Sequence, residues 1–303
     1  MGVRGTQCAV RRMIVPLALV FGCSESAPTP KVLLIGLDGV RVDILARANT
    51  PNIDALAEAG LFSAEAWTGE ETVSGPGWSS MVIGVWADKH GVHNNDFTDN
   101  RYDQYPDFLT RLEQVDPAFN TFAVLDWPPL GDDIDGGPLF SGAIDVKVTF
   151  DGEEMGYDLA DSLSVIAAVE HLANADPDAV FVYLGYIDIV GHDTSSLDPL
   201  YLAAIEAADV QVGQLIAAVE ARAGYDDEDW LILMSTDHGR RDDGGHGGQS
   251  LEERTIFYLA SGSFVLENDH PDGPFIVDVA VTALDHLGVA IDPGWGLDGT
   301  VRR

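Results

Sequence analysis

Four short segments of the sequence combine acidic, imidazole and hydroxyl side chains in a pattern that suits metal-assisted phosphoryl transfer. Carboxylates and imidazoles are the usual protein ligands of catalytic zinc, and a hydroxyl beside such ions can act as a nucleophile. The segments are LLIGLDGV with Asp38, TVSGPGWSSM with Ser74, YIDIVGHD with Asp188 and His192, and STDHGRRDDGGHGG with Asp237, His238 and His246. Together they predict a site that holds a pair of metal ions.

These residues divide into two groups of the size that a catalytic metal requires. A catalytic zinc takes about three protein ligands and keeps one position open, and two such ions can bind both oxygens of an in-line displacement. The expected ligands are, for one ion, Asp188, His192 and His246 and, for the other, Asp38, Asp237, His238 and the Ser74 oxygen. Zinc is the expected metal and manganese the alternative. Any one of these residues alone could be a turn former beside glycine, but the whole set favours metal binding.

Ser74 stands where a helix is expected to begin. It is followed by Gly75 and Pro76 and then by the helix-compatible run WSSMVIG. We expect Ser74 to cap this helix, whose free backbone N–H groups would face an anion. A divalent cation at that point would favour the ionised, nucleophilic form of the hydroxyl. An ordinary N-cap serine is the alternative interpretation, and Thr72 is the competing hydroxyl.

Strand-like and helix-like patterns alternate from residue 31 onward, which predicts a parallel sheet covered by helices. The expected strands are continuously apolar, as strands buried on both faces are. They span residues 32–37, 121–126, 179–185, 230–235 and 255–260. Ligands of such sheets bind beyond the carboxyl ends of the strands. Asp38, Asp188 and Asp237 all lie within a few residues of such an end.

Two helices are expected between these strands, because apolar residues recur there at helical spacing. The apolar stripes are Leu159, Leu163, Ile166 and Val169 in one helix and Ile205, Ala208, Val212, Leu215 and Val219 in the other. Each stripe predicts the face that a helix buries against its neighbours.

The 303 residues include 50 acidic and 16 basic side chains, which gives a formal net charge of −34. A surface with this charge repels polyanions at long range, so extended nucleic acid is not an expected partner. Divalent cations can reverse the sign inside a pocket, and a small anionic substrate is therefore compatible with the composition. No linker or repeat interrupts residues 31–303, which we expect to form one catalytic domain. The sequence gives no ground for inferring a protein partner.

Residues 1–22 have the pattern of a signal peptide. Three arginines precede the apolar stretch 13–22, which is too short to span a bilayer. The stretch ends before Cys23 in a sequence that resembles a bacterial lipoprotein cleavage box, and residues 23–30 would form a tether. We expect export to the bacterial cell envelope or periplasm, with membrane attachment through lipidated Cys23. Plain secretion and an uncleaved or wrongly assigned start are the alternatives.

In this order the segments resemble the alkaline phosphatase superfamily, specifically its type I phosphodiesterase and nucleotide pyrophosphatase branch. LDGVRVDIL followed by TPNIDALAEAG is similar to the first strand and helix of that branch. The resemblance implies an alkaline phosphatase-like three-layer α/β/α sandwich with a mostly parallel sheet. It also implies Ser74 as the nucleophile and Asn95, in GVHNND, as a residue that binds a phosphoryl oxygen. The metal ligands of the family map onto Asp38, Asp188, His192, Asp237, His238 and His246.

Three departures limit what the resemblance implies. The branch usually has threonine where this chain has Ser74. Only seven residues separate His238 from His246, where nucleotide-cleaving members commonly insert a long segment, and this argues against nucleotide specificity. Sulfatases of the same superfamily need an arginine four residues after the nucleophile, and Trp78 stands there instead.

The reaction that the resemblance implies is two successive in-line displacements on a small phosphate ester, through a phosphoseryl intermediate. A phosphodiesterase or pyrophosphatase is the first interpretation. A phosphomonoesterase, phosphonate hydrolase or phosphotransferase is the alternative enzyme, and a metal-containing surface binding protein is the alternative that is not an enzyme. Arg240 and Arg241 could add positive charge, but Asp242 and Asp243 beside them favour solvated ion pairs.

Overall fold

The computed structural model describes residues 1–3, 27–263 and 273–302. Most of the expected signal peptide and Cys23 lie outside the described residues. The first strand begins at Thr29. The last two residues of the segment 23–30, expected as a tether, therefore belong to the sheet.

A seven-stranded sheet forms the centre of the fold, in the order β2-β7-β6-β1-β5-β3-β4. The strands are β1 Thr29–Leu37, β2 Leu61–Trp67, β3 Thr121–Leu125, β4 Val146–Thr149, β5 Ala179–Leu184, β6 Glu228–Ser235 and β7 Thr255–Ser261. Neighbours from β6 to β4 pair in parallel, whereas β7 is antiparallel to both β6 and β2. The sheet is mostly parallel, as expected, and β6, β1 and β5 end side by side.

The sequence pattern predicts five of these strands and misses β2 and β4. The two missed strands lie at the edges of the sheet. In β2 only Ala66 is buried, and β4 has no buried residue. Edge strands therefore lack the continuous apolar run that identifies strands buried on both faces.

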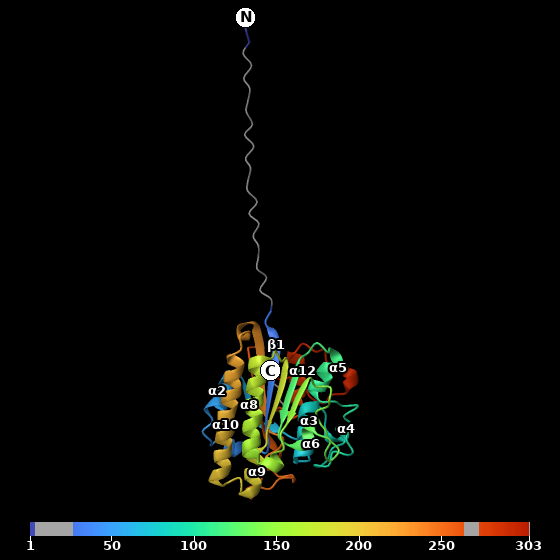
Figure 1. The fold of residues 1–303 in the computed structure, drawn as a ribbon, viewed down its shortest axis with the longest axis vertical. Coiled ribbons are helices and arrows are strands. Elements are labelled where there is room, and N and C mark those ends of the chain that lie inside the picture. The colour runs from blue at the N-terminus through green and yellow to red at the C-terminus, as the bar shows by residue number, and fades with distance from the viewer. Residues whose placement is uncertain (4–26, 264–272, 303) are drawn as a thin grey trace.

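Helices cover both faces of the sheet, with α2, α8 and α10 on one face and α3, α5 and α12 on the other (Figure 1). The helices are α1 Val42–Leu45, α2 Pro51–Ala59, α3 Ser74–Ile83, α4 Ala87–His90, α5 Phe108–Val115, α6 Pro128–Gly131, α7 Gly152–Met155, α8 Tyr157–Asn174, α9 Tyr186–Asp193, α10 Pro199–Glu220, α11 Leu251–Arg254 and α12 Asp278–His286. This is the three-layer α/β/α sandwich that the sequence predicts.

The central strand β1 shows why both layers are held firmly. Val32 and Leu34 pack in the core beneath α3, α5 and α12, whereas Leu33 and Ile35 pack beneath α8 and α10. All four side chains are fully buried. Complete burial of such a side chain typically stabilises the fold by about 1.5–3 kcal/mol. Packing on both faces therefore fixes the carboxyl end of β1, where Asp38 follows.

The buried face of α8 differs from the predicted one. Leu159 and Ile166 of the predicted stripe are 49% and 52% exposed. The helix instead buries Tyr157, Val165 and Leu172 together with the small or polar side chains of Ala160, Asp161, Ser164 and Ala168. Because small and polar residues share this face, an apolar stripe does not mark it in the sequence.

The predicted stripe of α10 is confirmed, because all five of its apolar residues are buried. By length and composition α10 could also cross a membrane. Its buried face packs in the core with β1, β5 and β6, and core helices of soluble proteins pass the same test. The apolar character of α10 is therefore explained by the fold.

Two buried aspartates face each other beside the carboxyl end of β3. Asp126 follows β3, and Asp161 lies in α8, where its Oδ1 accepts hydrogen bonds from the backbone N–H groups of Gly185 at 2.9 Å and Tyr186 at 3.3 Å. Neither carboxylate oxygen of Asp126 has a partner among the described residues that could donate to it. Burial raises the pKa of Asp161 to about 7, and burial followed by the charge of Asp161 raises the pKa of Asp126 well above its ordinary value. The pair therefore retains a proton that the unfolded chain releases.

This pair predicts a loss of stability as the pH rises. Between the ordinary aspartate pKa near 3.8 and about 7, the folded protein binds more protons than the unfolded chain, so the free energy of unfolding falls across that window. Asp126→Asn removes the titrating carboxyl and places an amide N–H group, which can donate a hydrogen bond, beside the Asp161 carboxylate. We expect it to stabilise the protein at pH 8 by on the order of 2 kcal/mol and to change little at pH 5. Urea unfolding at both pH values tests this, with exposed Asp133→Asn as the control; equal effects at the two pH values would contradict it.

Candidate active site

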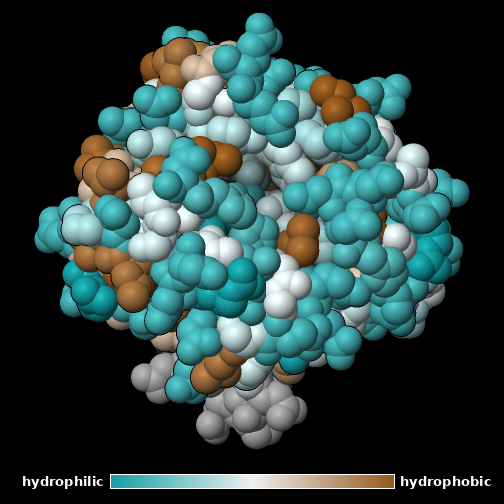
Figure 2. All heavy atoms as spheres, turned by 90° about the horizontal axis from the view of Figure 1, so that it is seen from below, coloured by the Kyte–Doolittle hydropathy of each residue, from teal (hydrophilic) through white to brown (hydrophobic). Residues whose placement is uncertain are grey.

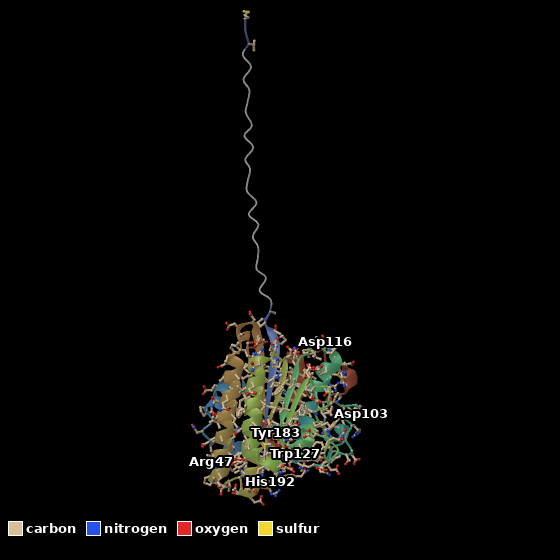
Figure 3. The ribbon with its side chains drawn as sticks, viewed as in Figure 1. Arg47, Asp103, Asp116, Trp127, Tyr183 and His192 are labelled. Carbon is tan, nitrogen blue, oxygen red and sulfur yellow. The ribbon has the colours of Figure 1, made fainter. Side chains whose placement is uncertain are left out.

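Three neighbouring strands end at one edge of the sheet, and expected ligands follow each of them. Asp38 directly follows β1, and Asp237 lies two residues after β6. Asp188 and His192 belong to α9, which begins just after β5. Figure 3 shows His192 at the end of the molecule opposite the start of β1. Figure 2 views the protein from that end and shows a largely hydrophilic face that is hollowed near its middle.

The first cluster consists of Asp38, Asp237 and His238, all of them buried. His238 Nε2 lies 3.3 Å from Asp237 Oδ2 and 3.8 Å from Asp38 Oδ1. These two carboxylate oxygens have no hydrogen-bond partner among the described residues. Buried acceptors without a donor are rare in proteins. Two such oxygens that converge with an imidazole nitrogen fit a divalent cation.

The other oxygen of each carboxylate, Asp38 Oδ2 and Asp237 Oδ1, accepts hydrogen bonds from neighbouring residues. Asp38 Oδ2 accepts hydrogen bonds from the Trp78 indole N–H at 2.9 Å and from the Tyr183 hydroxyl at 2.6 Å. Asp237 Oδ1 accepts one from the Gly39 backbone N–H at 3.0 Å. Such contacts orient the ligands at metal sites. The sequence did not identify Trp78 or Tyr183 in this role, because a core position suits both: Tyr183 lies in an apolar strand and Trp78 in an expected helix.

The electrostatics of this cluster also fit a cation. Burial raises the pKa of Asp38, and burial together with the Asp38 charge raises the pKa of Asp237 well above its ordinary value. Burial lowers the pKa of His238 well below its ordinary value, so its imidazole is neutral at neutral pH. Two buried carboxylates this close are stable as anions only beside a positive charge, and neutral imidazole is the form that binds a metal.

Ser74 is the first residue of α3, and Val73 is the N-cap. The expectation that the Ser74 side chain caps this helix is therefore wrong. Its hydroxyl is directed to the first cluster instead, with Oγ 3.3 Å from His238 Nε2. Gly77 permits this approach, since a Cβ there would lie 2.8 Å from the Cβ of Asp237. The structure thus brings the expected nucleophile, a helix N-terminus and the first cluster together.

Thr72, the competing hydroxyl, forms hydrogen bonds with the loop after His246. Its Oγ1 donates a hydrogen bond to the Gly248 carbonyl at 2.8 Å and accepts one from the Gly247 N–H at 3.0 Å. Its own carbonyl lies 2.9 Å from His246 Nδ1. Thr72 therefore positions His246, and the geometry favours Ser74 as the reactive hydroxyl.

The second cluster brings Asp188, His192 and His246 together. His192 Nε2 lies 3.3 Å from Asp188 Oδ2 and 2.9 Å from His246 Nε2, while His246 Nε2 lies 3.8 Å from Asp188 Oδ1. Burial lowers the pKa of His246 to about 4, so this ring too is neutral at neutral pH. The His192 side chain is 47% exposed, so this cluster opens toward solvent and the first does not.

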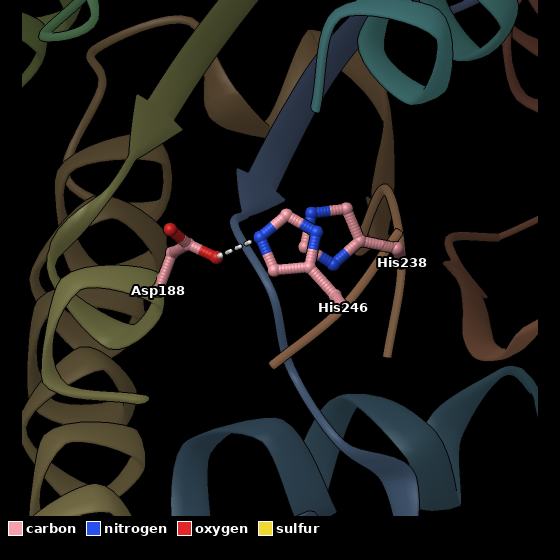
Figure 4. Close-up of side chains that lie close together, drawn as sticks. All are labelled: Asp188, His238 and His246. Atoms are coloured by element: carbon pink, nitrogen blue, oxygen red, sulfur yellow. Dashed lines mark ion pairs between the residues drawn. The ribbon is translucent and has the colours of Figure 1, made fainter. Parts of the chain in front are cut away.

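The two clusters are adjacent. Figure 4 shows the rings of His238 and His246 face to face, with Asp188 directed at His246. The ring centroids are 3.9 Å apart, and the planes differ by 15°. Ligand atoms of Asp188, His238 and His246 lie within 4.8 Å of one another. Two ions bound here would therefore be close enough to act on one phosphoryl group.

Arg240 is part of this site, and the solvated ion pair expected for it is wrong. Its side chain is fully buried and donates hydrogen bonds to two backbone carbonyls and to Asp188 Oδ1. Burial lowers the pKa of Arg240 to about 10, which leaves it charged at neutral pH. Arg241, in contrast, is partly exposed and lies 3.3 Å from Asp243 Oδ1, as expected, but it also forms a shorter ion pair, of 2.7 Å, with buried Glu253. Arg240 holds one oxygen of Asp188 and leaves the other facing His192.

Glycines form the slot that contains the Arg240 guanidinium. A Cβ on Gly191 would lie 2.7 Å from Arg240 Cζ. A Cβ on Gly39 would lie 3.0 Å from Arg240 Nε and 2.6 Å from Asp188 Oδ1, and Gly39 has a positive φ of 65°. Both positions therefore require glycine. The sequence offers a signal for this slot only in retrospect, because the two glycines come from separate segments of the chain.

Asn95 lies beside Ser74, as the resemblance implies. Its Oδ1 accepts a hydrogen bond from the Gly75 backbone N–H at 2.8 Å. A Cβ on Gly75 would lie 2.3 Å from the carbonyl oxygen of Asn94, so glycine is required for this approach. The Nδ2 group of Asn95 is the part that remains to contact a substrate oxygen.

Comparisons with known proteins agree with this arrangement. The family model described as type I phosphodiesterase/nucleotide pyrophosphatase matches residues 32–242. An uncharacterized pyrophosphatase/phosphodiesterase of Schizosaccharomyces pombe is 25% identical over 227 residues, which are 69% of this chain and 44% of that protein. A 2,3-bisphosphoglycerate-independent phosphoglycerate mutase of Haloarcula marismortui is 29% identical over 161 residues, or 47% of this chain and 30% of the mutase. The chain thus spans less than half the length of these relatives.

Solved structures share the fold at low sequence identity. Murine ectonucleotide pyrophosphatase/phosphodiesterase 5, in an inactive form with AMP, superimposes with a TM-score of 0.67 at 16% identity, and the match covers 89% of this chain and 97% of the murine one. A 2-O glycosaminoglycan sulfatase also gives a TM-score of 0.67, at 14% identity over 90% of this chain and 73% of its own. Both show an alkaline phosphatase-like fold, which by itself hosts more than one chemistry.

Proposed function

Because the chain belongs to the type I phosphodiesterase/nucleotide pyrophosphatase family, we propose that it is a divalent-metal-dependent hydrolase of a small phosphate diester with Ser74 as its nucleophile. Asp38, Asp237, His238 and the Ser74 hydroxyl would hold one metal ion. Asp188, His192 and His246 would hold the other. Zinc is the first expectation for both ions, and manganese is the alternative.

The observation that carries this proposal is the pair of unpartnered oxygens, Asp38 Oδ1 and Asp237 Oδ2, in the cluster that also contains Ser74 Oγ. A cluster with a purely structural role would satisfy buried oxygens with N–H or O–H donors. These oxygens instead suit a cation, and a hydroxyl at a helix N-terminus lies at the same point. A surface protein that used its metals only for structure would not need that hydroxyl, so the arrangement favours an enzyme.

Several residues of the chain would each contribute to a double displacement, as nucleophile or as donors to the phosphoryl oxygens. Ser74 Oγ attacks phosphorus, the Oγ–P bond forms as the bond from phosphorus to the leaving alcohol breaks, and water then cleaves the Oγ–P bond to regenerate the serine. When bound, the metal ions supply positive charge that favours ionised Ser74 and stabilises the leaving oxygen. Asn95 Nδ2 and the backbone N–H of Ser74 would bind the non-bridging oxygens, because Pro76 has no N–H and those of Gly75 and Gly77 donate to Asn95 and Val73. Loss of one such donor typically costs about 10²-fold in rate.

A phosphotransferase is the second candidate. Its support is the similarity to phosphoglycerate mutases, which reaches 29% identity with the Haloarcula marismortui protein. The phosphoserine that we propose is compatible with transfer to an acceptor alcohol as well as to water. A phosphotransferase would show product formation that depends on an added alcohol, whereas a hydrolase would not.

Matched p-nitrophenyl esters test the proposed function. Protein lacking residues 1–23, loaded with zinc or manganese, should cleave a p-nitrophenyl phosphodiester with a higher kcat/KM than the p-nitrophenyl monoester. The diester carries one negative charge and the monoester carries two, so the comparison also tests how the acidic surface affects the substrate. A clear preference for the monoester would move the assignment to a phosphomonoesterase and contradict the proposal.

A further inference from the structure

His246 lies between two pairs of glycines, in the sequence GGHGG at residues 244–248. This segment lies outside every helix and strand, and Gly244 and Gly247 have positive φ angles of 85° and 95°. Glycine restricts the backbone less than any other residue, so the segment has little conformational preference of its own. The position of the His246 ring therefore depends on contacts with other parts of the chain.

Thr72 and Glu253 both form hydrogen bonds with this segment. Thr72 Oγ1 accepts one from the Gly247 N–H and donates one to the Gly248 carbonyl. Glu253, which is buried in α11, accepts one from the Gly248 N–H at 2.8 Å through Oε1. Both backbone polar groups of Gly248 thus bond to side chains outside the segment, and these bonds fix the backbone just after His246.

Arg241 connects Glu253 to the start of the segment. Its Nη1 atom donates a hydrogen bond to Glu253 Oε1 at 2.7 Å. Its backbone N–H donates one to the Gly245 carbonyl at 2.8 Å, and its carbonyl accepts one from the Gly244 N–H at 3.0 Å. A Cβ on Gly245 would clash with Arg241 Nη2, so the guanidinium packs directly against this glycine. Glu253 therefore holds the segment at both of its ends.

Glu253 also has an ordinary structural role. It is the third residue of α11 and forms a capping box with Ser250, in which its Oε2 accepts a hydrogen bond from the Ser250 N–H at 3.0 Å. A capping box satisfies donors at the start of its own helix and needs no contact elsewhere. The bonds of Oε1 to Gly248 and Arg241 reach outside α11 and are additional to the box. Capping alone thus does not explain this side chain.

We propose that Glu253 is a positioning residue for His246 and thereby sets the affinity of the second cluster for its metal ion. Both oxygens of Glu253 accept hydrogen bonds, so the side chain acts through the segment of His246 and is not itself a ligand. Loss of a group that orients a metal ligand typically weakens metal binding about 10–100-fold. The inference rests on the proposed function, because it takes Asp188, His192 and His246 as a metal site.

Zinc titration of Glu253→Gln by calorimetry tests this inference. Glutamine has the same shape but no charge and only one side-chain oxygen, so it cannot make all the contacts of Glu253. The dissociation constant of the zinc ion at the second cluster should rise about 10–100-fold. That of the first cluster should not change, because Glu253 contacts the segment of His238 through its backbone carbonyl, which accepts a hydrogen bond from the Gly239 N–H at 2.9 Å.

Other variants assign the effect to His246. His246→Ala removes a ligand and so identifies the weakened ion, and adding Glu253→Gln to it should have no further effect on zinc binding. Glu252→Gln makes the same chemical change at the exposed neighbouring residue of α11 and should change nothing. Arg241→Met breaks the same ion pair while leaving the capping box in place, and it should weaken the same zinc ion. This last variant decides the matter if Glu253→Gln does not fold.

Hydrogen exchange of the zinc-free protein needs neither metal nor turnover, and it therefore separates this inference from the proposed function. The Gly248 amide should exchange about tenfold faster in Glu253→Gln and at the wild-type rate in Glu252→Gln. If the wild-type protein binds two zinc ions but cleaves no diester, the proposed function fails while the titrations still test Glu253.

In a protein that does cleave the diester, excess zinc should restore the kcat of Glu253→Gln, because the defect lies in affinity. Unchanged zinc affinity and unchanged exchange in Glu253→Gln would overturn the inference. Equal weakening of both zinc ions would also overturn it, since this is the result of a purely structural role.

Discussion

Replacement of Ser74 by alanine should abolish cleavage of a phosphodiester while leaving the fold and the metal content intact. The Oγ atom lies 3.3 Å from His238 Nε2, in the cluster that contains the unpartnered oxygens of Asp38 and Asp237. Its removal leaves the carboxylate and imidazole ligands in place but takes away the atom that bonds to phosphorus. Loss of a nucleophile typically lowers kcat by about 10³-fold or more.

Two other hydroxyl variants make this test decisive. Ser162→Ala, at an exposed position in α8, is the matched control and should retain full activity. Thr72→Val removes the competing hydroxyl and should reduce activity less than Ser74→Ala, because Thr72 acts through the loop of His246. If Thr72→Val abolished turnover and Ser74→Ala did not, Thr72 would be the nucleophile and the proposed mechanism would be wrong.

Removal of the metal ions is expected to have the second large effect, on both activity and stability. Chelation should stop turnover, and zinc or manganese should restore it. The chelated protein should also be less stable, because Asp38 and Asp237 then face each other in a buried site without a cation. A metal present at 1,000 times its dissociation constant stabilises a folded protein by about 4 kcal/mol, which sets the scale of the expected loss.

Asp237→Asn distinguishes this electrostatic account from a nonspecific effect of the chelator. The substitution removes one of the two opposed carboxylates, so the chelated variant should be more stable than the chelated wild-type protein. It should also bind less metal and gain little stability when zinc is added. Thermal melting with and without zinc measures both effects, and exposed Asp103→Asn is the control. Full turnover by the chelated wild-type protein would contradict the account.

The positions of the main site residues could be predicted from the sequence for a physical reason. Asp38 and Asp237 follow apolar runs, and parallel strands bring such positions to one edge of a sheet. The order of the strands was not needed for this inference. Because β1, β5 and β6 are neighbours, residues far apart in the chain converge at one point.

The residues that support the site could not be predicted in the same way. Arg240 lies two residues before a pair of acidic residues in the sequence, and only Gly39 and Gly191, from two separate segments, create the buried slot that contains it. Tyr183 belongs to an apolar strand, and its hydroxyl reaches Asp38 only because β5 lies next to β1. The buried face of α8 was missed for a related reason, since it mixes small, polar and apolar side chains and therefore leaves no continuous apolar stripe.

X-ray diffraction data collected at the zinc absorption edge from crystals of the zinc-loaded protein test the central claim most directly. The account predicts two anomalous peaks. One should lie among Asp38, Asp237, His238 and Ser74 Oγ, and the other among Asp188, His192 and His246. A protein that cleaves the diester with no peak in the first cluster, or with Ser74 Oγ turned away from it, would contradict the account.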